Sequence, residues 1–104
     1  MDRLNSLLQF AAEEPDEPFN LYALALEYLK VDTNEALLLF QRLVDRHPEY
    51  LPTYYPYAQL LAEKKDRAGA ERIFAQGIEV ARSKGELKTM RELQSAYQDF
   101  TYGA

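Results

Sequence analysis

Apolar side chains recur along this chain at intervals of three and four residues, the spacing that lines one face of an α-helix. One stripe consists of Leu21, Leu24, Ala25 and Tyr28, and the next of Ala36, Leu39, Phe40, Leu43 and Val44. Between the stripes, Asp32 or Thr33 can accept hydrogen bonds from the free N–H groups of a following helix, and Glu35 lies three residues beyond Asp32. The pattern therefore predicts a unit of helix, turn and helix.

The same pattern returns after 33 or 34 residues. A shift of 33 places Leu21 on Tyr54, Tyr22 on Tyr55 and Ala25 on Ala58, and a shift of 34 places Ala36 on Ala70, Phe40 on Phe74 and Val44 on Ile78. A period in this range is typical of chains built from stacked supersecondary units, each of which buries its apolar face against its neighbours.

The repeated positions resemble the tetratricopeptide repeat family, whose pattern runs from a large residue through Leu-Gly and Tyr to Ala, an aromatic residue and Pro. The first full repeat has Leu21, Leu24-Ala25, Tyr28, Ala36, Phe40 and Pro48 at these places, and the second has Tyr54, Tyr57-Ala58, Leu61, Ala70 and Phe74. The first repeat is one residue short in its turn, and Arg82 replaces the closing Pro of the second. The resemblance implies an all-α, right-handed solenoid of helical hairpins with about six helices.

We expect one domain over residues 1–104, made of an N-terminal capping helix (1–15), repeat 1 (18–50), repeat 2 (51–84) and a C-terminal capping helix (86–100). Pro15 lies 33 residues before Pro48, so the first helix, capped by Asp2, resembles the second half of a repeat. The helix that starts at Pro18 is expected to run to Lys30, and Gly85 is expected to end a helix that starts at Arg67. The apolar face of the last helix is predicted to consist of Leu87, Met90, Leu93 or Gln94, Tyr97 and Phe100.

Two details at the repeat ends stay open. Pro56 lacks an N–H group, which is harmless only in the first turn of a helix. If Pro52 begins the helix, Pro56 is its fifth residue and the turn must loosen; if Thr53 is the cap, Pro56 is third and fits. The tail, residues 101–104, is expected to fray or to fold back into the groove.

In this family the first helix of each repeat lines the concave surface, and the resemblance assigns partner contacts to its second, fifth, ninth and twelfth positions. In this chain these positions hold Phe19, Tyr22, Leu26 and Leu29, then Pro52, Tyr55, Gln59 and Ala62. The candidate partner-binding residues are Phe19, Tyr22, Leu26, Leu29, Tyr55 and Gln59, with Tyr55 the best exposed contact. Only Asn20 and Glu27 are not apolar between Phe19 and Leu29, so we expect this helix to be buried nearly all round. In the alternative interpretation, its second stripe is ordinary core.

The Lys and Asn residues with which some family members hold an acidic carboxyl terminus are missing, since their places hold Tyr22, Ala23 and Leu26. A hydrophobic or aromatic-anchored peptide or helix is thus the expected guest. We predict a protein-interaction adaptor; the alternative is a structural module that self-associates as a homodimer.

Charge and composition argue against nucleic-acid partners and against a membrane-spanning segment. Residues 1–52 hold four Lys or Arg against ten Asp or Glu (net −6), and residues 53–104 hold eight against seven (net +1), for a total of −5. This acidity argues against nucleic acid, and the acidic cluster Glu13, Glu14, Asp16 and Glu17 is interpreted as a solvated turn. No apolar run reaches the roughly 18 residues of a membrane span, and no export signal is seen, so we expect a cytoplasmic protein.

Catalysis has little support in the sequence. The chain has no Cys and one His, and His47, just before Pro48, is expected to play a structural part at a helix end. Asp32-Thr33-Asn34 lacks the central Gly and distal Glu of a calcium loop. We predict no enzyme activity, no cofactor and no metal.

Overall fold

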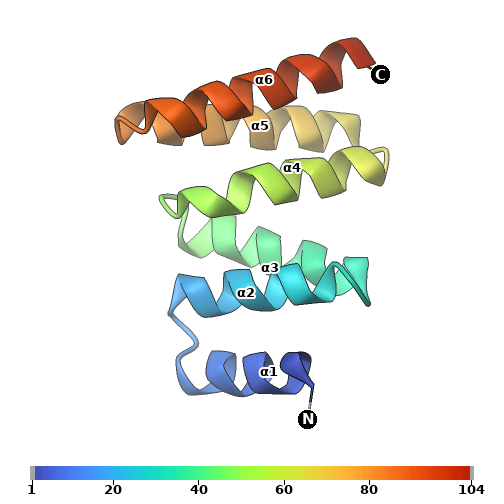
Figure 1. The fold of residues 1–104 in the computed structure, drawn as a ribbon, viewed down its shortest axis with the longest axis vertical. Helices are drawn as coiled ribbons and strands as arrows, with labels where there is room; N and C mark the ends of the chain where they lie inside the picture. The colour runs from blue at the N-terminus through green and yellow to red at the C-terminus, as the bar shows by residue number, and fades with distance from the viewer. Residues whose placement is uncertain (1, 104) are drawn as a thin grey trace. The chain divides into compact units, whose positions relative to one another are not determined.

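The computed structural model describes residues 2–103, which form six α-helices and one short 3₁₀ turn, with no strand among them (Figure 1). The elements are α1 (Arg3–Glu13), α2 (Pro18–Tyr28), α3 (Thr33–Arg46), η1 (Leu51–Thr53), α4 (Tyr54–Glu63), α5 (Arg67–Ser83) and α6 (Leu87–Gly103). They confirm the predicted all-α architecture of helical hairpins. The helices fall into two compact units: α1, α2, α3 and η1 form unit 1, and α4, α5 and α6 form unit 2.

In unit 1, α2 packs against α1 and against α3. The carboxylate of Asp2 caps α1 by accepting from the N–H of Asn5 at 2.8 Å, as predicted. At α3 the cap is Asp32, which accepts from the N–H groups of Asn34 (3.1 Å) and Glu35 (3.4 Å). These side chains satisfy N–H groups that the first turn of each helix leaves free.

The helix α2 ends at Tyr28, two residues before the predicted Lys30. The N–H of Val31 donates to the carbonyl of Tyr28 at 3.0 Å, and the N–H of Asp32 donates to the same oxygen at 2.7 Å. These bonds close a tight turn, because the chain has only four residues in which to reverse direction before α3. The buried residues of unit 1 are Leu7, Leu21, Ala23, Leu24, Ala25, Ala36, Leu39, Phe40, Leu43 and Thr53.

In unit 2, α4 packs on α5 and α5 packs on α6. Pro56 is the third residue of α4, the position that the second of the two predicted starts gave it. Thr53 does not cap the helix through its side chain, because its Oγ1 is buried without a hydrogen-bond partner, and the 3₁₀ turn η1 leads into α4 instead. The hydroxyl of Tyr54 accepts from the Nε2 of Gln76 at 3.4 Å, which ties α4 to α5. Between α5 and α6, the ring of Phe74 stacks on Tyr97 at 5.5 Å and meets Phe100 at 5.8 Å.

Both turns of unit 2 use a residue with positive φ after a helix. Gly85 (φ 72°) ends α5, as predicted, and Lys65 (φ 67°) does the same after α4. In each turn, the N–H of the next residue reaches back to the helix, from Glu86 to Ala81 and from Asp66 to Leu61, both at 2.9 Å. This is the Schellman arrangement, which satisfies carbonyls at a helix end and favours glycine.

Two expectations about α6 are wrong. Thr101, Tyr102 and Gly103 continue the helix, because no Pro or Gly interrupts it before Gly103; Ala104 lies outside the described residues. Leu87 is 51% exposed, while Leu93 and Ala96 are buried and Gln94 is exposed. Leu87 lies six residues before Leu93, which at about 100° per residue places it about 120° away from the buried face.

Candidate partner-binding surfaces

The four candidate residues of unit 1 share one side of α2. Phe19 is 60% exposed, and Tyr22, Leu26 and Leu29 are half-buried, with Leu29 just beyond the last residue of the helix. The expectation that this helix is buried nearly all round is therefore wrong at Phe19. The opposite side of α2, with Leu21, Leu24 and Ala25, takes up the packing inside unit 1, so the second apolar stripe keeps part of its surface open to solvent.

Tyr22, one of the candidate residues on α2, forms an aromatic pair with Tyr50. The rings of Tyr22 and Tyr50 meet edge to face, with centroids 5.7 Å apart and an angle of 65° between the planes. Burial raises the pKa of the Tyr22 hydroxyl; burial and the neighbouring charges of Tyr22 and Glu17 raise the pKa of Tyr50. Glu17 also caps α2, accepting from the N–H of Phe19 at 3.2 Å. The surface thus combines aromatic rings with one carboxylate.

Tyr55 lies on α4 in unit 2 and is 46% exposed, as predicted, while Tyr54 and Tyr57 are buried. It lines a cavity of about 450 Å³ together with Glu92, Ser95, Ala96 and Asp99 of α6. These four residues were missed by the sequence prediction, although their spacing of three and four places them on one face of α6. Gln59 is half-buried on α4 and does not line this cavity.

Each unit therefore carries its own part of the candidate set, four residues on or next to α2 and two on α4. The part in unit 2 is more polar than predicted, because the carboxylate side chains of Glu92 and Asp99 line the same cavity as Tyr55. Carboxylates bind Lys or Arg through charge-assisted hydrogen bonds, and an aromatic face attracts the same cations.

We next consider His47, metal-binding groups and membrane-spanning helices in residues 2–103. His47 follows the last residue of α3, where its N–H donates to the carbonyl of Leu43 at 2.7 Å. Its Nε2 is buried without a hydrogen-bond partner, and no group of three or more His, Asp or Glu residues in this part of the chain could hold a metal ion. None of the six described helices has the length and apolar character needed to cross a membrane.

Comparison with known proteins agrees with this architecture. A sequence model of the tetratricopeptide repeat matches residues 31–98, which is more than half of the chain. No curated protein sequence matches the chain.

Several solved structures share the helical-repeat fold of this chain. The solution structure of a tetratricopeptide repeat domain protein from Salinibacter ruber is 43% identical, with 84% of this chain and 89% of that chain aligned at a TM-score of 0.79. A crystal structure of such a protein from the same organism is also 43% identical and covers 82% of this chain and 97% of that chain, at a TM-score of 0.77. The solution structure of a Bordetella parapertussis protein, 22% identical, shares the fold over 99% of this chain and 90% of that chain at a TM-score of 0.82.

Proposed function

Because the chain belongs to the tetratricopeptide repeat family, we propose that it is a protein-interaction adaptor that binds a segment of another protein through side chains of α2 and α4. The observation that carries this proposal is the exposure of two aromatic side chains, Phe19 and Tyr55, on the first helix of each repeat. Large aromatic groups left in water at the centre of an interaction surface supply much of the binding free energy when a partner covers them.

The residues around Phe19 and Tyr55 indicate which side chains a bound segment should carry. In unit 1, Phe19 and the pair Tyr22 and Tyr50 offer apolar surface and ring edges, which suit an aliphatic or aromatic anchor. In unit 2, the carboxylates of Glu92 and Asp99 beside Tyr55 suit a Lys or Arg side chain. We therefore expect a segment bound by unit 1 to carry an apolar anchor and a segment bound by unit 2 to carry a basic residue.

Selection of peptides from a random-sequence display library against the immobilised chain tests this proposal. We expect the selected peptides to be enriched in aromatic or aliphatic residues and in Lys or Arg. Phe19→Asp should weaken binding of the best apolar peptide, and Tyr55→Asp should weaken binding of the best basic peptide, each by at least about tenfold, because each removes a central contact.

Val31→Asp provides a matched control, since Val31 is an exposed apolar side chain in the turn between α2 and α3 and lies outside the candidate set. Circular dichroism establishes that each variant is folded. If folded Phe19→Asp and Tyr55→Asp variants bind the selected peptides as tightly as the natural chain does, the proposed surface is not the binding surface.

A further inference from the structure

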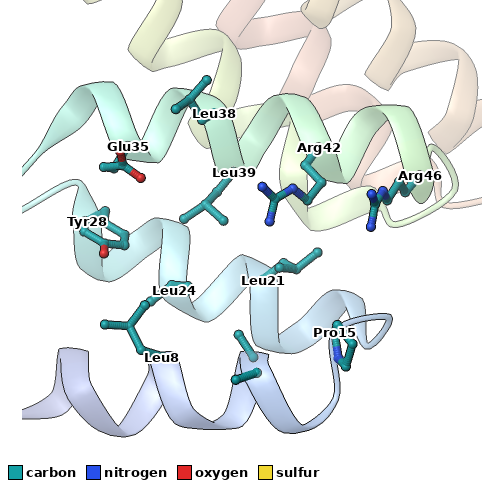
Figure 2. A pocket seen from close by; sticks show the side chains of 12 residues that line it. Leu8, Pro15, Leu21, Leu24, Tyr28, Glu35, Leu38, Leu39, Arg42 and Arg46 are labelled. Carbon is teal, nitrogen blue, oxygen red and sulfur yellow. The ribbon is translucent and has the colours of Figure 1, made fainter.

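Unit 1 contains a cavity of about 350 Å³, which we call the α1–α3 groove (Figure 2). Its floor includes Leu21 and Leu24 of α2, and its walls include Leu8 of α1 and Leu38, Arg42 and Arg46 of α3. The two floor residues are buried, whereas Leu8 is 40% and Leu38 is 57% exposed. The wall formed by α1 also contains Ala11 and Ala12, whose short side chains leave the groove unfilled.

The α1–α3 groove is separate from the surface proposed above for the partner segment. Leu24 lies five residues after Phe19, and at about 100° per residue the two side chains leave α2 about 140° apart. A molecule in the groove would touch the side of α2 that faces into unit 1 rather than the stripe of Phe19 and Tyr22. The two surfaces can therefore be tested independently.

The charges along the groove are unevenly placed. Arg42 and Arg46 are one helical turn apart on α3, and both are exposed; neither forms an ion pair with any residue from 2 to 103. Figure 2 shows them toward the end of the groove where Pro15 lies, while Tyr28 and Glu35 lie at the other end. Two like charges at this spacing repel each other, and bound carboxylates would relieve that repulsion.

We propose that the α1–α3 groove binds an amphipathic helix of a partner protein, which places leucine-like side chains between Leu8 and Leu38 and acidic side chains on Arg42 and Arg46. An apolar groove with charged walls is the usual receptor for such a helix. Because residues 1–52 carry a net charge of −6, overall attraction cannot hold an acidic partner. An acidic partner must therefore be held by direct contacts with the guanidinium groups of Arg42 and Arg46. Its affinity should then depend on these two residues, which can be tested by substitution.

The probe is a synthetic helix-forming peptide of about 14 residues, or about four turns. It has leucines on one face and two Glu residues one turn apart beside them; a matched probe has Lys in place of both Glu. Binding of each labelled probe is measured by fluorescence anisotropy. We expect the acidic probe to bind the natural chain at least about tenfold more tightly than the basic probe, since two charge-assisted contacts are exchanged for two repulsive ones.

Reversing the charges on the protein should reverse this preference. In the double variant Arg42→Glu, Arg46→Glu, the acidic probe should lose at least about tenfold in affinity and the basic probe should gain. Arg72→Glu is the matched control, because Arg72 is an exposed arginine on α5 that does not line the groove. Leu38→Asp should weaken both probes, and Phe19→Asp should weaken neither.

The proposal is wrong if the natural chain binds neither probe, if it binds both equally, or if the folded double variant keeps the natural preference. It is also wrong if the natural chain forms a dimer on concentration that the double variant does not form, because a second copy of the chain would then be the occupant. Circular dichroism and the melting temperature of each variant separate these results from loss of folding.

Discussion

At the scale of single residues, Lys65 is the clearest source of strain. Its φ of 67° lies in the left-handed region, which costs a residue with a Cβ about 1–2 kcal/mol relative to glycine. Glycine also lowers the free energy of unfolding by about 0.5–1 kcal/mol, because it makes the unfolded chain more flexible. We predict that Lys65→Gly stabilises the protein by about 0.5–1 kcal/mol, measured as a higher midpoint of urea unfolding with an unchanged slope.

Gly85 gives the matched reverse experiment. It occupies the same place after α5, at φ 72°, and no atom lies within 4 Å of the position that a Cβ would take. Gly85→Ala therefore introduces backbone strain without a clash, and we expect a loss of about 1 kcal/mol in urea unfolding. An equal or higher stability of Gly85→Ala would contradict the assignment of strain to both turns.

We predict that the free energy of unfolding falls at alkaline pH because of Tyr22 and Tyr50. Because the folded chain raises the pKa of both Tyr22 and Tyr50 above 10.0, it holds their protons more tightly than the unfolded chain does. Their contribution to the free energy of unfolding is complete below about pH 10 and is lost as the pH rises through the folded pKa values. Urea unfolding at several alkaline pH values should show this fall, and Tyr50→Phe should make it smaller; an equal fall in that variant would contradict the prediction.

At the scale of elements, the packing of α4 on α5 depends on Gly77. A Cβ at this position would lie 2.6 Å from the Cβ of Tyr54 and 2.9 Å from its Cγ, and neither atom is the far end of a flexible side chain. Helix propensity alone would favour Ala over Gly by about 1 kcal/mol. We predict that the clash prevails and that Gly77→Ala destabilises the protein by about 1–3 kcal/mol in urea unfolding; a gain in stability would show that α4 and α5 can move apart without cost.

At the scale of the whole molecule, the division of charge bears on self-association. Unit 1 carries −6 and unit 2 carries +1, because Thr53 at the boundary is uncharged. Two copies that met through unit 1 would repel each other, most strongly at low ionic strength. We predict a solution mass that does not change with dilution in low-salt buffer. A dilution-dependent mass that is lost in the Tyr22→Glu, Leu26→Glu variant would support the homodimer alternative and weaken the adaptor proposal.

The sequence predicted most of the fold because the signals that form it are local. The stripes at three- and four-residue spacing located the helices, Asp2 and Asp32 marked two helix starts, and Gly85 marked a helix end. The errors in helix length lie at helix ends: α2 stops before Lys30 and α6 continues to Gly103. A helix end depends on which of several competing hydrogen bonds the packed chain allows, and a periodic pattern does not record that.

For the candidate surfaces, the sequence by itself determined which residues share a face, since the angle between side chains on a helix follows from their spacing. It therefore placed Phe19 with Tyr22 on one side of the helix. Only the tertiary structure decided which faces stay open and what stands opposite them: the carboxylates beside Tyr55, and the groove in which Arg42 and Arg46 face α1. The physical reason is that exposure depends on the size of side chains from other helices, and residues distant in the sequence meet only after packing.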